Sequence, residues 1–135
     1  MAKFAAVDYF VSIGGVDFSN SINSVELTEE ADNLETTAFG STFRTRIGGL
    51  KQASLTLNFM QDFAASSVDA TLHPLLGSIS TVVIKPTSGT VTATNPSYTV
   101  AALVTQYSPF SSSIGDLATL SVTWPVSGSV TRATA

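Results

Sequence analysis

The stretch LKQASLTLNF, residues 50–59, alternates apolar and polar side chains with a period of two. An extended chain places these side chains on two faces, with Ala53, Leu55, Leu57 and Phe59 on one and Ser54, Thr56 and Asn58 on the other. Such alternation is typical of a β-strand that buries one face and exposes the other. The fold is therefore expected to be built on a sheet.

Four further segments carry strand patterns. LATLSVTWPV (117–126) alternates in the same way, and INSVELTEE (22–30) continues the period. YTVAALVTQY (98–107) and STVVIKP (80–86) are rich in β-branched residues and predict more deeply buried strands. A first hairpin is predicted within FAAVDYFVSIGGVDFSN, because Gly14-Gly15 forms a two-residue turn that tolerates positive φ.

One segment favours a helix. In SSVDATLHPLLG, residues 66–77, a serine able to cap precedes apolar residues at helical spacing, and Pro74 limits the length. SVTRATA, residues 129–135, is expected to be a loose end. Residues 1–135 are thus predicted to form one mainly β domain, a sandwich or barrel of six to eight strands with one short flanking helix.

Composition excludes several functions. The net charge of −4, the pI near 4.6 and only six basic residues argue against a protein that binds nucleic acid by neutralising phosphates. The uncharged stretch 86–115 contains too much Ser, Thr, Asn and Pro for a membrane span. The first residues lack the features of a secretory signal, so synthesis in the cytoplasm and a soluble product are expected.

Uncharged hydroxyls replace much of the usual surface charge. The chain contains 19 Ser and 18 Thr, while charged residues make up 12%. Burying a hydrogen-bonded hydroxyl against a partner costs far less than burying an unpaired charge. The composition therefore favours a protein that is buried in an assembly.

No motif supports catalysis or a cofactor. The chain has one histidine, His73, no cysteine and no GxSxG motif, so neither a nucleophilic triad nor a transition-metal site has its usual components. The acidic run EEADNLE (29–35) lacks the spacing of a calcium loop, and IGGLK (47–51) lacks the frame of a phosphate loop. We expect no enzyme, no metal and no cofactor.

The charge that is present is sorted by sign. Residues 26–51 hold eight of the sixteen charged residues, acids first and bases after. One interpretation is a charged hairpin exposed to water. The other is complementarity between copies, with Phe39 and Phe43 as apolar anchors. The residues predicted to contact another copy are Glu29, Glu30, Asp32, Glu35, Phe39, Phe43, Arg44 and Arg46.

The order of three segments resembles the tail tube proteins of long-tailed bacteriophages. SVELTEEADNLETTAFGSTFRTRIGGLKQASLTLNF joins an acidic strand through a T-T-x-F-G turn to a basic G-L-K strand entry. The helical segment SVDATLHPLLG follows, and then NPSYTVAALVTQYSPFSSSIGDLATLSVTWPVSG. The resemblance covers most of the chain, although many tube proteins are longer.

The resemblance implies a function. Tube proteins form hexameric rings whose inner sheets join into a β-barrel lumen, and the rings stack into a tube that conducts DNA without binding it specifically. The loop holding Phe39, Gly40, Phe43, Arg44 and Arg46 would reach a neighbouring subunit or ring. Six chains of net charge −4 would give an acidic lumen that repels phosphate. The partners would be other copies and the tail proteins at the two ends, in the virion tail.

Two alternatives remain open. A capsid decoration protein would also be small, β-rich and rich in Ser and Thr, but would bind a shell without polymerising end to end. An immunoglobulin-like binding module would be a stable monomer with an aromatic platform near Tyr98, Tyr107 and Phe110.

Overall fold

The computed structural model describes residues 3–135, which form eight strands, one α-helix and one 3-10 turn. The elements, in chain order, are β1 (Phe10–Ile13), β2 (Val16–Asp17), β3 (Ile22–Glu35), β4 (Arg46–Met60), α1 (Val68–Leu72), η1 (His73–Leu75), β5 (Ile79–Lys85), β6 (Ser97–Leu103), β7 (Thr119–Pro125) and β8 (Thr131–Ala133). The prediction of a mainly β fold with one short helix is confirmed.

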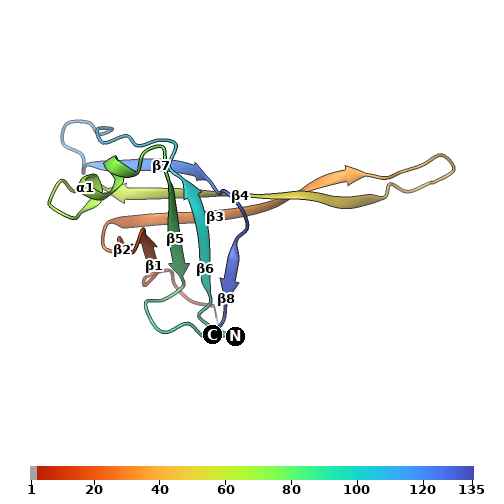
Figure 1. The fold of residues 1–135 in the computed structure, drawn as a ribbon, viewed down its shortest axis with the longest axis horizontal. Helices are drawn as coiled ribbons and strands as arrows, with labels where there is room; N and C mark the ends of the chain where they lie inside the picture. Colours follow the sequence, from red (N-terminus) through yellow and green to blue (C-terminus); the bar gives the residue numbers. More distant parts are fainter. Residues whose placement is uncertain (1–2) are drawn as a thin grey trace.

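The strands form two sheets that pack face to face. One sheet has the order β2-β1-β5-β6-β8 and the other the order β3-β4-β7, with every pairing antiparallel. Figure 1 shows the strands of the three-stranded sheet running across those of the five-stranded sheet. The core lies between the two layers.

The alternating residues of β4 and β7 fill this core as predicted. β4 buries Leu55, Leu57 and Phe59, and β7 buries Leu120, Val122 and Trp124. The five-stranded sheet meets them with five buried side chains: Val11, Ile13, Val82, Val100 and Ala102. Trp124 satisfies its indole N–H by donating to the carbonyl of Gln106 at 3.0 Å. The ring can therefore be fully buried without an unpaired polar atom.

The first hairpin forms where the sequence predicts it. Gly14 and Gly15 have φ of +58° and +86°, the left-handed region that glycine occupies at little cost. This turn joins β1 to β2, with Ile13 opposite Val16.

The predicted helix is short. Val68 and Leu72 are fully buried and close one end of the sandwich. Ser67 occupies the N-cap position, but its side chain forms no capping hydrogen bond. Pro74 falls in η1, where the chain tightens into a 3-10 turn. The helix ends early for the reason expected, because proline cannot continue it.

Two segments differ from expectation. The strand predicted over 98–107 ends at Leu103, although Val104 still bonds to residues 77–78 ahead of β5. Gln106 turns instead to β7, where it bonds to Thr123 and Trp124. The C-terminal segment is not loose, since β8 pairs with β6 from Ser97↔Ala133 to Thr99↔Thr131. This second prediction was wrong because a three-residue edge strand has too little pattern to be seen in the sequence.

Candidate assembly surfaces

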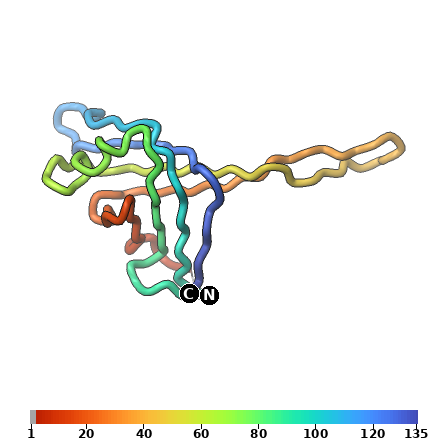
Figure 2. Tube along the Cα trace, viewed as in Figure 1, coloured from red at the N-terminus to blue at the C-terminus, as the bar shows by residue number. Residues whose placement is uncertain are grey.

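A two-stranded arm projects from the body of the protein. β3 and β4 pair from Ile22↔Phe59 to Glu35↔Arg46, but β7 covers only residues 54–60 of β4. The arm is residues 29–53, and Figures 1 and 2 show it extending well beyond the body. Residues 29–35 of β3 alone give it a length of about 24 Å at about 3.4 Å per residue. The arm is thus long enough to reach another molecule.

A β-bulge shapes the arm. Ala31 pairs with Lys51 and Asn33 with Gly48, so Asp32 lies opposite two residues of β4. A Cβ atom at Gly49 would lie 3.0 Å from Cβ of Asp32, which is tighter than nine in ten real Cβ contacts. A side chain at this position would therefore crowd the bulge, which sets the local twist and bend of the arm.

The tip of the arm is the loop 36–45. The Thr36 N–H donates to the Thr45 carbonyl at 2.7 Å, and the hydroxyls of the same two residues are also 2.7 Å apart. These bonds close the loop across its base. Phe39 and Phe43 point away from it, with exposed fractions of 110% and 84%. The tip therefore presents two aromatic rings to its surroundings.

The acidic strand lies beside the basic strand of the same chain. Oε1 of Glu35 lies 3.2 Å from Nη1 of Arg44, the one salt bridge found within the described residues, and Glu35 also faces Arg46 across the hairpin. Glu30 accepts a hydrogen bond from Nε2 of Gln52 at 3.3 Å. Pairing within one hairpin accounts for part of the sorting of charge, and contact between copies stays a prediction.

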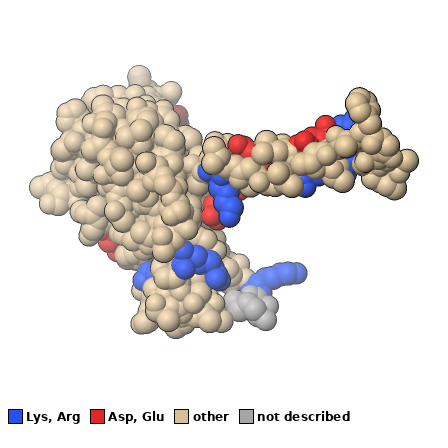
Figure 3. Space-filling model, turned by 45° about the vertical axis from the view of Figure 1, so that its right-hand side comes forward, with Lys and Arg blue, Asp and Glu red and all other residues tan. Residues whose placement is uncertain are grey.

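All eight residues predicted to contact another copy are exposed on the arm or its tip. They are Glu29, Glu30, Asp32, Glu35, Phe39, Phe43, Arg44 and Arg46. Figure 3 shows red and blue atoms spread along the arm, whereas the visible face of the body is largely uncharged. The structure thus brings the predicted residues together on one projecting element.

The arm carries further exposed apolar side chains, which were not predicted from the sequence. Leu34 lies opposite Ile47 across the hairpin, and both are exposed, as is Leu50. A two-stranded hairpin without a packed face is marginally stable in water. Two signals in the sequence indicate these side chains. Leu34 interrupts a run of charged residues, and Ile47 and Leu50 flank two glycines.

The outer face of the three-stranded sheet is lined mainly by hydroxyls. The side chains pointing away from the core are Ser24, Glu26, Thr28, Ser54, Thr56, Asn58, Ser121 and Thr123. Their hydroxyls bond to neighbours on the same face, as Thr56 does with Thr123 at 3.3 Å and Thr28 with Glu26 at 3.4 Å. This set, the hydroxyl face, holds one carboxylate and no lysine or arginine.

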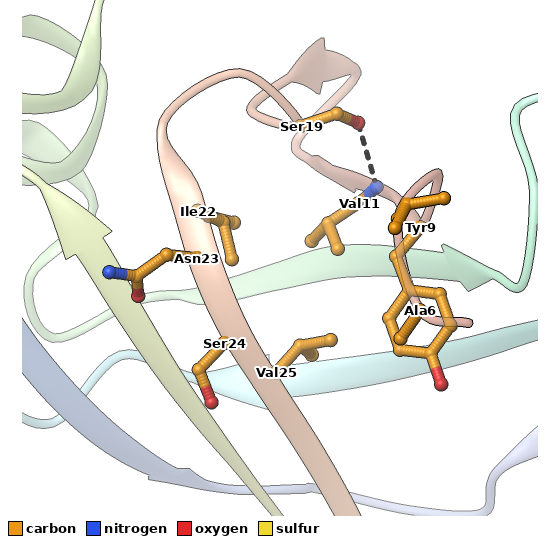
Figure 4. Close-up of a pocket in the computed structure, with 9 residues that line it drawn as sticks. Ala6, Tyr9, Val11, Ser19, Ile22, Asn23, Ser24 and Val25 are labelled. Carbon is orange, nitrogen blue, oxygen red and sulfur yellow. Dashed lines mark hydrogen bonds between the residues drawn. The ribbon is translucent and has the colours of Figure 1, made fainter.

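β3 and β7 are the two edges of this sheet. Neither pairs on its outer side with another strand in residues 3–135. The outer side of β3 borders a hollow of about 380 Å³ (Figure 4), toward which Ile22 and Val25 point from β3 and Val11 from β1. The Val11 N–H donates to Oγ of Ser19 at 3.1 Å there. No acid, lysine, arginine or histidine lines this hollow, so it offers no general base and no charged metal ligand.

His73 is exposed at the start of η1. No group of three or more His, Cys, Asp or Glu residues in the range 3–135 is placed to hold a metal ion. No helix in that range is long and apolar enough to cross a bilayer. The features that stand out are the arm, its tip and the hydroxyl face.

Comparisons with known proteins identify the fold. No protein-family model and no curated protein matches the chain. A chain from the virion of a native gene transfer agent particle is similar in structure, with a TM-score of 0.75 and 13% identity over 98% of this chain and 100% of that one.

A second solved chain has the same fold. It comes from the tail of an empty gene transfer agent particle, computed with helical refinement and C6 symmetry. The TM-score is 0.66 and the identity 16%, over 85% of this chain and 83% of that one. The fold of this protein is therefore one found in assembled, phage-like particles, and it spans nearly the whole chain.

Proposed function

We propose that this protein is the structural subunit of a phage-like tail tube, which polymerises as stacked rings around a channel that conducts DNA. The observation that carries the proposal is the fold shared with a chain of a gene transfer agent tail. The C6 symmetry of that tail supports a ring of six copies. The protein would act in the virion tail, bound to other copies and, at the two ends of the tube, to other tail proteins.

The arm supports polymerisation. It exposes five large apolar side chains that the single chain leaves uncovered: Leu34, Phe39, Phe43, Ile47 and Leu50. A projecting element that buries its surface on a different part of another copy makes a heterologous contact, and such contacts repeat into rings or filaments. The apolar surface on the arm is thus best explained by a second copy.

The edges of the three-stranded sheet support ring closure. β3 and β7 are both antiparallel to β4, so they are parallel to each other. Pairing of β7 in one copy with β3 in the next would continue the sheet around a ring and would leave no exposed edge. In such a barrel the five-stranded sheet and α1 would lie outside, and the hydroxyl face would line the channel.

The chemistry of the hydroxyl face suits a channel for DNA. Protein binding to duplex DNA depends on Lys and Arg neutralising phosphates. The hydroxyl face offers neither, and its one carboxylate, Glu26, would repel phosphate weakly in each copy. The net charge of the chain is a poor guide to the charge of the channel, because Glu29, Asp32 and Glu35 lie on the arm. We therefore propose a channel lining that is mostly uncharged, with one carboxylate from each copy.

Negative-stain electron microscopy of the purified protein, at rising concentration and at low and high salt, tests this function. We expect hollow tubes or stacked rings with six-fold end views. A matched variant replaces residues 37–44 by an Asn-Gly turn, which shortens the arm and leaves the body intact. This variant should keep the far-ultraviolet circular dichroism of a folded chain and lose the tubes. Monomers or trimers of the full chain at every concentration would contradict the proposal and favour a capsid decoration protein.

A further inference from the structure

A second exposed apolar cluster lies at the end of the body opposite the arm. It is formed by the loops 61–67 and 104–118, here called the rim, which adjoin the end of β4 and the start of β7. Figure 1 shows these loops and the arm at opposite ends of the long axis. We propose that the tip of one copy docks on the rim of the next copy. This inference rests on the proposed tail-tube function and names the surface that receives the arm.

The rim presents aromatic and aliphatic side chains to solvent. Phe63 and Phe110 stack with ring centroids 5.5 Å apart and an interplanar angle of 26°. Both rings are exposed, as are Ile114 and Leu117 in the same loops. Contiguous exposed apolar side chains in a soluble protein mark an interaction site. The rim therefore offers the kind of surface that Phe39 and Phe43 of a tip can cover.

Hydrogen bonds hold the two rim loops together. Nε2 of Gln61 donates to the carbonyl of Pro109 at 3.0 Å and to the hydroxyl of Tyr107 at 3.2 Å. The Tyr107 hydroxyl in turn donates to Oδ1 of Asp69 in α1 at 2.7 Å. These bonds fix the loop before any partner arrives. A preorganised surface loses less conformational entropy on binding.

The charges of the tip and the rim are opposite. The tip and the first residue of β4, residues 36–46, contain Arg44 and Arg46 and no acid. The rim loops contain Asp62 and Asp116 and no base. All four of these side chains belong to exposed residues. Opposite charges around an apolar centre steer association and fix its orientation.

The placement of the two clusters determines what they can build. Because they lie at opposite ends of one molecule, a chain cannot cover its own rim with its own tip. A tip on the rim of the next copy is a heterologous contact that leaves a new tip and a new rim free. Repetition along the long axis extends the assembly without limit, which is the contact needed between successive rings.

A charge-reversal rescue tests the contact. Arg44→Glu with Arg46→Glu, and separately Asp62→Arg with Asp116→Arg, should each give a folded chain that no longer pellets as polymer. The four substitutions combined should restore pelletable tubes, because the attraction is re-established with reversed sign. The circular dichroism spectrum of each variant separates loss of assembly from loss of folding.

Cross-linking tests proximity, because the natural chain contains no cysteine. Thr42→Cys chains carrying a size tag are mixed with untagged Ser113→Cys chains, assembled, and treated with a short bismaleimide. These positions adjoin Phe43 and Ile114, are exposed, and leave both apolar side chains in place. The expected product is one tagged copy linked to one untagged copy. Val7→Cys replaces Ser113→Cys in the control, because Val7 is 87% exposed and lies outside the rim. The control mixture should give no product above background.

The outcomes separate this inference from the function on which it rests. Absence of tubes from the natural chain would overturn both. Suppose instead that the natural chain forms tubes, while the fourfold variant gives no rescue and no product links residues 42 and 113. That result would overturn the rim as the surface that receives the arm and would leave the tail-tube function standing.

Discussion

Oε1 of Glu35 lies 3.2 Å from Nη1 of Arg44 across the base of the arm's tip. The two side chains belong to one hairpin and remain largely exposed. Exposed ion pairs of this kind contribute about 0.2–1 kcal/mol to stability. The pair therefore adds little to the stability of the arm, and the net charge of the tip remains available to a partner.

Exchanging the two charges separates these roles. Glu35→Arg combined with Arg44→Glu restores the pair in reverse and keeps the net charge of the arm, so we expect normal assembly. Arg44→Glu combined with Arg46→Glu places two new carboxylates beside Glu35 and reverses the sign of the tip, so we expect loss of polymer. Sedimentation of both variants is the measurement. Equal loss in both would show that a positive charge at position 44 itself, and not the net charge of the arm, governs assembly.

Gly49 and Gly48 give a matched comparison for the shape of the arm. Gly49→Ala would bring a Cβ atom to 3.0 Å from Asp32 and 3.1 Å from Leu34, whereas a Cβ atom at Gly48 meets nothing within 4 Å. We expect Gly49→Ala to displace the bulge and weaken polymerisation, and Gly48→Ala to have little effect. The thermal unfolding of the body should be the same in both, because the arm does not contribute to the core. Similar polymerisation by the two variants would refute the role of the bulge.

The sequence predicts the body better than the arm, for a physical reason. Residues 53–59 and 120–126 alternate because one face is buried, so their pattern reports the core directly. Residues 29–35 are exposed on both faces, so their hydrophobic pattern does not indicate that they project from the body. The eight contact residues were predicted from their charge and aromatic character. Their position beside one another depends on the register of β3 and β4, which the sequence does not show.

Other features depend on contacts that a linear sequence does not contain. Phe63 and Phe110 are far apart in the sequence. The pairing of Met60 with Thr119 brings together the loops that hold them, so their rings can stack. Among the three aromatics of the alternative binding platform, Tyr107 packs against the core and Tyr98 is half-buried, whereas Phe110 is exposed in the rim. The three rings therefore do not form one exposed platform.

Tyr107 links the rim to α1 and gives a pH-dependent prediction. Burial, and then the hydrogen bond to Asp69, raise the pKa of the Tyr107 phenol above its ordinary value of 10.0. The folded chain thus holds this proton more tightly than the unfolded chain. The resulting stability is fully present below pH 10.0 and is lost as the pH rises through the folded-state pKa.

Tyr107→Phe should reveal this contribution. At neutral pH the variant should be less stable by about 1 kcal/mol, because the hydrogen bonds of the hydroxyl are lost. Above pH 10.0 the difference in stability between the two proteins should shrink. The unfolded natural chain then ionises its phenol, which favours unfolding, and a phenolate in the folded chain would lie beside Asp69. The variant has no phenol and is subject to neither effect. Urea midpoints of both proteins at the two pH values provide the measurement. A difference that does not change with pH would contradict the expectation.

The hydroxyl face allows a test of the channel. Ser121→Lys with Thr123→Lys adds two positive charges to each copy on that face. If the face lines a channel, tubes assembled in the presence of a short oligonucleotide should retain it in a salt-dependent form that resists nuclease. Natural tubes should retain none.

The control places lysine on the other sheet. Thr81→Lys adds a charge at an exposed position of β5, which would lie on the outside of the proposed tube. Any oligonucleotide bound by this variant should be open to nuclease. Nuclease-resistant DNA in the Thr81→Lys tubes, or nuclease-sensitive DNA in the Ser121→Lys, Thr123→Lys tubes, would reverse the assignment of inside and outside.

A helical reconstruction of the assembled protein by electron cryomicroscopy tests the tail-tube proposal directly. We expect rings of six copies, the hydroxyl face of β3, β4 and β7 toward the channel, and Phe43 of one ring against Ile114 of the next. A reconstruction with the five-stranded sheet toward the channel, or with the arm folded onto its own ring, would contradict it.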